Sequence, residues 1–98
     1  MILEILAEAE RELVEAALWY ESRRLGLGKR FRDEAARVLD RIAQDPLLWR
    51  ERDGGYRRVN FPVFPFYIPY FIRGEKIIVA AIAHERREPG YWRPRSPR

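Results

Sequence analysis

The sequence is short of side chains that bind metals or carry redox chemistry. Its 98 residues include no cysteine and a single histidine, His84. Without cysteine the chain can form neither a disulfide framework nor a thiolate zinc site. One imidazole is too few for a histidine-rich metal site. We therefore expect the protein to use no metal ion and no cofactor.

Long hydrophobic runs are also missing. No apolar stretch approaches the roughly 20 residues that a membrane-spanning helix needs. Glu4 interrupts the first apolar stretch before it reaches the length of a signal-peptide core. The sequence therefore predicts a cytoplasmic protein with no membrane partner.

Acidic side chains are scarce in the second half of the chain. Residues 1–45 carry eight basic and ten acidic side chains, whereas residues 46–98 carry 11 basic and five acidic ones, a net charge of +6. Ten of those 11 basic residues are arginines, whose forked guanidinium suits phosphate and carboxylate groups. The asymmetry favours a polyanionic partner, either nucleic acid or an acidic protein segment. The alternative is a solvated surface without a specific partner.

Two adjacent apolar segments predict a β-hairpin over residues 66–83. Residues 77–83 are uninterrupted apolar sequence, which is typical of a strand buried on both faces. Residues 66–72 form the preceding strand, and Gly74 can adopt the positive φ of a tight turn. A two-residue turn at Gly74 would place Tyr67 opposite Ile82 and Pro65 opposite His84.

The remaining segments complete an α+β domain. Residues 2–6 predict a strand, residues 7–24 and 29–44 two helices with apolar stripes, and residues 56–61 another strand. The element order is β-α-α-β-β-β, and we expect a small antiparallel β-sheet packed on an α-helical hairpin. Residues 1–92 would form this single domain, and residues 93–98 a flexible tail rich in proline and arginine. Arg58, Asn60 and Tyr67 would share the sheet face away from the helices.

Several segments, taken in order, resemble the RelE/ParE family of bacterial toxins from type II toxin–antitoxin systems. They are AEAERELVEAALWYE at 7–21, LGLGKRFRDEA at 25–35, RIAQDP at 41–46, FPFYIPY at 64–70 and HERREPGYW at 84–92. The resemblance spans almost the whole chain, and its most specific part is His-x-Arg-Arg-x-Pro-x-x-Trp after an apolar strand. It implies the same α+β fold, a cytoplasmic location in a bacterium, growth inhibition, and neutralisation by a cognate antitoxin in a toxin–antitoxin complex that can be of higher order.

The family divides by target, so the resemblance leaves the activity open. RelE-like members cleave mRNA on the ribosome, using two lysines on the second strand, an arginine on the third, a later arginine and a C-terminal tyrosine. In this sequence the lysines correspond to Arg58 and Asn60, the third-strand arginine to Tyr67, and the later arginine to Arg86. The tyrosine corresponds to Trp92 or, shifted by one residue, to Tyr91. Two cations of the nuclease pattern are thus absent, which favours a ParE-like inhibitor of DNA gyrase.

The candidate site residues follow from this comparison. For target binding they are Arg57, Arg58, Tyr67, Arg86, Arg87, Tyr91 and Trp92. If the protein is instead an mRNA endoribonuclease, with ribosome and mRNA as partners, the catalytic candidates are Arg58, Arg86, His84 and Tyr91. A third possibility is a non-toxic relative that only binds an antitoxin. Structural roles remain open for two of these side chains: His84 as a hydrogen-bond partner of the following loop, and Trp92 as a cap on the core.

Overall fold

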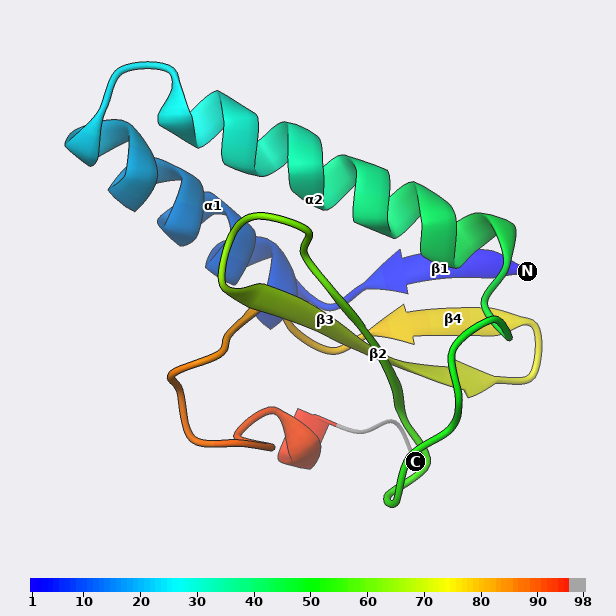
Figure 1. Cartoon of the computed structure of the whole chain (residues 1–98). Coiled ribbons are helices and arrows are strands. Elements are labelled where there is room, and N and C mark those ends of the chain that lie inside the picture. Colours follow the sequence, from blue (N-terminus) through cyan, green and yellow to red (C-terminus); the bar gives the residue numbers. More distant parts are fainter. Residues whose placement is uncertain (96–98) are drawn as a thin grey trace.

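A computed structural model describes residues 1–95 as one sheet with two helices packed on one of its faces (Figure 1). The helices are α1 (Ala7–Arg23) and α2 (Leu27–Gln44). The strands are β1 (Ile2–Ile5), β2 (Arg57–Asn60), β3 (Phe66–Arg73), β4 (Lys76–Val79) and the short β5 (Ala83–His84). The predicted α+β class and element order are confirmed, with β5 as an addition.

The sheet is mixed, so the prediction of a purely antiparallel sheet was wrong at one edge. Its order is β1-β4-β3-β2, with β5 also paired to β3. β1 pairs with β4 in parallel, from Ile2 opposite Lys76 to Ile5 opposite Val79. The two helices carry the chain from β1 across the sheet, and such crossovers permit parallel neighbours. Hydrophobic alternation marks a strand but carries no information about its direction.

The main hydrophobic core lies between the helices and the sheet. Phe31 is fully buried on α2, and its ring packs against the rings of Tyr20, Phe61, Phe64 and Phe66. The aliphatic part of this core includes Val38, Ile42, Val59, Ile68, Ile77 and Val79. These positions follow the 3.6-residue period on α2 and the two-residue period on the strands, which is why pattern alone located the elements.

The hairpin register matches the predicted one near the turn and then slips by one residue. Arg73 lies opposite Lys76, and the amide of Ala80 still donates to the carbonyl of Pro69, 3.0 Å away. Beyond this point Tyr67 faces Ala83, not Ile82. An extra residue is thus accommodated at positions 80–82, as in a β-bulge. The seven-residue apolar run is therefore divided into β4 and β5.

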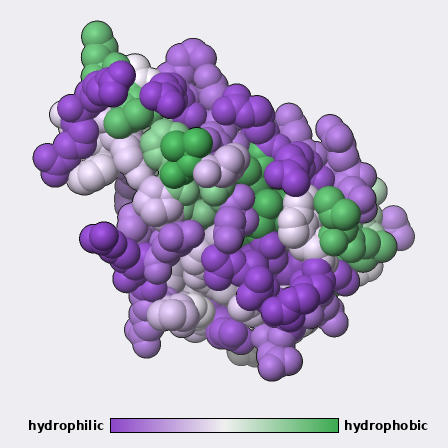
Figure 2. Space-filling model, in the orientation of Figure 1, coloured by the Kyte–Doolittle hydropathy of each residue, from purple (hydrophilic) through white to green (hydrophobic). Residues whose placement is uncertain are grey.

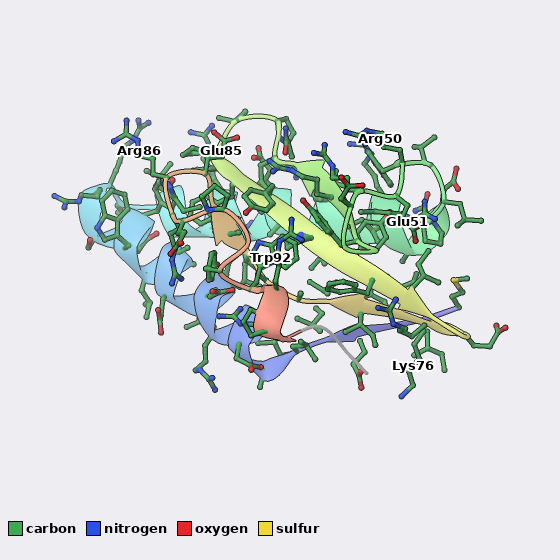
Figure 3. All side chains as sticks on the ribbon, turned by 90° about the horizontal axis from the view of Figure 1, so that it is seen from below. Arg50, Glu51, Lys76, Glu85, Arg86 and Trp92 are labelled. Atoms are coloured by element: carbon green, nitrogen blue, oxygen red, sulfur yellow. The ribbon has the colours of Figure 1, made fainter. Side chains whose placement is uncertain are left out.

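A second cluster of buried residues lies on the sheet face away from the helices. It consists of Tyr67, Phe71, Ala80, Ala81, Ala83 and Trp92, with Tyr56 and Tyr91 packed beside it. The small alanines leave room for the indole of Trp92, whose side chain covers the middle of the sheet in the view of Figure 3. Both faces of the central strands are consequently buried, which agrees with their unbroken apolar sequence.

The described part of the predicted tail belongs to the folded domain. Arg93–Arg95 form a short 3-10 helix, η1, and Arg95 donates to the backbone carbonyl of Ala80 at 3.1 Å. Arg93 also donates to the carbonyl of Asp53, so residues 93–95 contact the rest of the fold, which differs from the flexible tail expected from residue 93 onward. Residues 96–98, the rest of the predicted tail, lie outside the described residues. Within residues 1–95, no helix combines the length and hydrophobicity needed to cross a membrane.

Gly28 allows the two helices to approach closely. A Cβ atom at this position would lie 2.4 Å from the backbone oxygen of Ala17 on α1. The Glu21 carboxylate closes the same turn, since it accepts hydrogen bonds from the amides of Gly26 and Gly28 at 2.9 and 3.0 Å. These contacts explain why the helical hairpin turns at this point in the sequence.

We therefore expect Gly28→Ala to destabilise the protein. In an exposed helix the same change raises the free energy of unfolding by about 1 kcal/mol. Here the added methyl group would force the helices apart, and we expect a loss of ~1–3 kcal/mol. Urea denaturation measures the difference, and a stabilised variant would contradict the close approach of α1 and α2.

Candidate target-binding surface

Arg58 is held in a fixed orientation on the sheet face away from the helices. Its guanidinium carbon lies 3.7 Å from the centre of the Tyr67 ring. Its Nε and Nη2 atoms donate to Oδ1 of Asn60 at 3.3 and 2.8 Å. The predicted grouping of Arg58, Asn60 and Tyr67 on one face is confirmed, because Asn60 and Tyr67 are direct cross-strand partners. Stacking on an aromatic ring and a forked hydrogen bond restrict the side chain without neutralising its charge.

Tyr67 and Trp92 lie in the interior and present no exposed side chain to a partner. Their exposed fractions are 5% and 1%. Nε1 of Trp92 donates to the Tyr67 hydroxyl at 3.0 Å, so the two aromatic side chains satisfy each other's polar atoms. Their place among the target-binding candidates therefore needs correction. The alternative interpretation of Trp92, a cap on the core, agrees with the structure.

Arg57 faces the opposite side of the sheet from Arg58. Adjacent residues of a strand alternate between faces, and Arg57 is the cross-strand partner of Tyr70, which lies in the main core. Its Nη1 atom donates to the carbonyl of Trp49 at 2.8 Å, which fastens the loop after α2. The structure therefore separates Arg57 from the other candidates and gives it a contact within the fold.

His84 is a structural hydrogen-bond partner of the loop that follows it. Its Nδ1 atom accepts a hydrogen bond from the amide of Arg86 at 3.0 Å. Its ring packs edge-on against Phe66 with the centroids 4.9 Å apart, on the helix side of the sheet. The imidazole also borders a small cavity of about 240 Å³ beside Trp19 and Tyr20 of α1. The prediction that His84 bonds the following loop is confirmed.

Sequence reasoning missed Glu12, the residue that holds the C-terminal segment against α1. Its carboxylate accepts hydrogen bonds from the Tyr91 hydroxyl at 2.7 Å and from two nitrogens of Arg95 at 3.1 and 3.2 Å. It also accepts one from the amide of Ile82 at 3.1 Å, a donor that lies in the bulge. Arg87 makes a longer contact of 3.4 Å. A carboxylate on the inward-facing side of α1, beside Ala9 and Leu13, was the only signal in the sequence.

The contact with Glu12 also affects the ionisation of Tyr91. Burial, followed by the hydrogen bond to the Glu12 carboxylate, raises the pKa of the Tyr91 hydroxyl well above its usual range. A tyrosine is a neutral phenol at pH 7 even at its ordinary pKa, and the raised pKa keeps the hydroxyl protonated, and able to donate to Glu12, at alkaline pH as well. Arg87 covers the outer face of its ring, with the guanidinium carbon 3.7 Å from the ring centre.

The four candidate nuclease residues are not brought together. Arg58 lies on one face of the sheet, whereas His84 contacts the core on the other. The Tyr91 hydroxyl is bound to Glu12, and Arg86 lies at the margin of the molecule with its guanidinium directed outward (Figure 3). Within residues 1–95, no three histidine, aspartate or glutamate side chains are placed to hold a metal ion. The exposed candidates are the arginines of the 84–91 loop and the ordered guanidinium of Arg58.

Comparison with known proteins decides the family. A family model described as "ParE toxin of type II toxin-antitoxin system, parDE" matches residues 3–89. The chain belongs to the ParE toxin family. No curated protein matches it significantly. A solved chain from the chromosomal ParDE toxin–antitoxin system of P. aeruginosa has the same fold, with a TM-score of 0.66 and 17% sequence identity over 86% of this chain and 95% of that one. This ParE-family protein is thus a type II toxin–antitoxin toxin.

Proposed function

We propose that this ParE-family toxin inhibits DNA gyrase by binding it and carries out no chemical step of its own. The observation that carries the proposal is the use of Asn60 and Tyr67 within the fold. Asn60 holds the guanidinium of Arg58, and the Tyr67 hydroxyl bonds Trp92. In the RelE-like pattern these positions supply cations. Cleavage of RNA needs positive charge placed at the developing phosphorane, and neutral, engaged side chains do not supply it.

Binding to a protein makes different demands, and the 84–91 loop is suited to them. Arg86 and Arg87 are exposed, and Arg87 is stacked on the ring of Tyr91. Arginine and tyrosine are prominent among the residues that dominate the energy of protein interfaces. The loop is held at both ends, by His84 through the Arg86 amide and by Glu12 through Tyr91. We therefore place the gyrase contact on this loop.

A paired assay tests the target. Purified toxin is added to gyrase with relaxed plasmid, and separately to ribosomes programmed with mRNA. We expect loss of supercoiling or trapped cleaved plasmid, with the mRNA intact. Arg86→Ala with Arg87→Ala should weaken gyrase inhibition at least tenfold, whereas Arg30→Ala with Arg37→Ala, the same charge change on the exposed side of α2, should not. Cleavage of mRNA with unaffected gyrase would overturn the proposal and make Arg58 and Arg86 the first catalytic candidates.

Membership of the family implies a cognate antitoxin, and we propose that it covers the turn between the helices. A groove of about 580 Å³ opens there between α1 and the start of α2. Its walls include Val14, Leu18 and Leu25, with exposed fractions of 55, 65 and 91%. Figure 2 shows hydrophobic surface at this end of the helical hairpin. An amphipathic antitoxin segment that folds on binding would bury these side chains.

The prediction for this groove is that Leu18→Asp abolishes neutralisation and leaves toxicity intact. Expression of the toxin alone should arrest bacterial growth, and co-expression of the antitoxin encoded beside it should restore growth. A buried aspartate in the interface would be costly to desolvate, so the Leu18→Asp variant should no longer be rescued. Leu47→Asp, at an equally exposed leucine beyond the far end of α2, is the control that should still be rescued. Harmless expression of the folded wild-type toxin would identify a non-toxic relative.

A further inference from the structure

Three arginines form an ordered layer over the second aromatic cluster, on the sheet face away from the helices. Arg58 lies over Tyr67, with its guanidinium carbon 3.7 Å from the ring centre, and Arg73 lies 5.2 Å from the ring centre of Phe71. Arg93 lies 5.1 and 5.7 Å from the ring centres of Tyr56 and Trp92. Figure 3 views this face, with Trp92 over the sheet. The layer joins the neighbouring strands β2 and β3 with η1, which lies later in the sequence.

The charges of these arginines are not neutralised within the described residues. Their hydrogen bonds go to neutral oxygens: Arg58 to Oδ1 of Asn60, Arg73 to the carbonyl of Ile72 and Arg93 to the carbonyl of Asp53. The arginines that form ion pairs within residues 1–95 are Arg87 and Arg95, and both pair with Glu12 of α1. Three guanidiniums are therefore oriented by aromatic rings and neutral acceptors while they keep their full charge.

We propose that this arginine layer binds the phosphate backbone of duplex DNA without reading its sequence. Guanidinium groups match the geometry of phosphate oxygens, and contacts to phosphates position a protein on DNA without specifying bases. Three of the four aromatic rings beneath the arginines, those of Tyr67, Phe71 and Trp92, are buried and cannot stack on bases. The fourth ring, that of Tyr56, is partly buried and lies under Arg93. A surface with exposed aromatic rings that stack on bases would suit single-stranded DNA. A surface that offers guanidinium groups with little exposed aromatic area suits the phosphate backbone of a duplex.

An acidic protein segment is the competing partner, and the surface fits it less well. Binding of a peptide draws most of its energy from apolar anchors that enter pockets. The cavities found beside Leu18, beside Trp19 and beside Glu12 adjoin α1, whereas the arginine layer covers rings that are already packed. The proposal goes beyond the inhibition of gyrase and does not depend on it, although gyrase would present such DNA beside the toxin.

The salt dependence of DNA binding provides the test. Binding of the isolated toxin to a fluorescein-labelled 20-base-pair duplex is followed by fluorescence anisotropy between 50 and 200 mM salt. Three phosphate contacts predict a slope of log K against log salt of about −2.7, or a ~40-fold loss of affinity over this range. Replacement of Arg58, Arg73 and Arg93 by glutamine should remove this slope. Replacement of Arg30, Arg32 and Arg37 by glutamine, an equal charge change on exposed α2 positions, should leave most of it.

Each alternative gives a different result. Equal loss of binding in the two triple variants would show an effect of net charge alone and would overturn the proposal. Tighter binding to a single strand of the same length, or displacement of the duplex by polyglutamate at equal charge, would also overturn it. Arg73→Gln keeps the test valid if the triple variant does not fold, because Arg73 lies at the exposed end of the hairpin. This single variant should reduce the magnitude of the slope of log K against log salt by about 0.9. An unchanged slope would contradict the proposal that the arginine layer binds phosphates.

Discussion

Replacement of Trp92 by alanine is expected to lower the free energy of unfolding by ~3–5 kcal/mol, the range for truncation of a fully buried aromatic side chain. The indole is 1% exposed and packs edge-on against Tyr56 and Phe71. Its removal would leave a cavity against the sheet, and the Tyr67 hydroxyl would lose its partner. Chemical denaturation of the purified variant measures the change.

Two further variants make this prediction specific. Trp92→Phe keeps an aromatic ring but loses the hydrogen bond to Tyr67, and it should cost about 1 kcal/mol for that bond in addition to imperfect packing. Trp19→Ala removes the same side chain from a position that is 53% exposed, and we expect a loss of no more than about 1 kcal/mol. If Trp92→Ala were as stable as Trp19→Ala but no longer toxic, Trp92 would be a contact residue and its burial in the structure would be wrong.

Replacement of Glu12 by alanine is expected to lower the free energy of unfolding by ~2–4 kcal/mol and to detach the C-terminal segment. The change would leave the amide of Ile82 without its acceptor. It would leave the guanidinium of Arg95, which is 20% exposed, without its ion pair and with the Ala80 carbonyl as its remaining acceptor. Arg87 would contribute little to the loss, because its side chain is 55% exposed and solvent screens the pair. Denaturation measures the energy, and the indole N–H resonance of Trp92 reports whether the segment stays in place.

The controls for Glu12 separate charge from shape. Glu12→Gln keeps an oxygen that can accept from Tyr91 or Ile82 and loses the ion pair with Arg95, so its loss should be intermediate. Glu15→Ala, at an exposed position on the same helix, should change stability by less than about 0.5 kcal/mol. Equal stabilities of the Glu12→Ala and Glu15→Ala variants would show that the carboxylate is not the centre of these contacts.

The elements of this protein were predictable because their hydrophobic patterns are local. The stripe of Phe31, Ala35, Val38 and Ile42 predicted α2, and the apolar run after Lys76 predicted the buried centre of the sheet. Gly74 marked the hairpin turn, and it has a φ of +59°. Each of these signals is local. An apolar face is read from the spacing of hydrophobic residues, and a glycine marks a position where the backbone can adopt a positive φ.

The candidate site was only partly predictable from the sequence, because side chains of the same type have different contacts in the folded protein. Arg57 and Arg58 are adjacent in sequence, yet one bonds the Trp49 carbonyl and the other is stacked on Tyr67. Strand alternation alone would have separated them. Arg86 and Arg87 could be assigned to an exposed loop from the sequence, and their role in binding gyrase stays a prediction.

The sequence by itself determined the α+β class, the helices, the hairpin and the resemblance to the toxin family that comparison confirmed. The tertiary structure decided which aromatic side chains are buried, because Ala80, Ala81 and Ala83 leave a space that Trp92 fills, 9 to 12 residues later in the chain. It also decided the role of Glu12, since the bulge frees the amide of Ile82 and brings it to a carboxylate 70 residues earlier in the chain. The hydrogen bond between Ile82 and Glu12 depends on one extra residue in the strand. A local sequence pattern does not show which backbone amide of a strand will lack a cross-strand partner and need a side-chain acceptor.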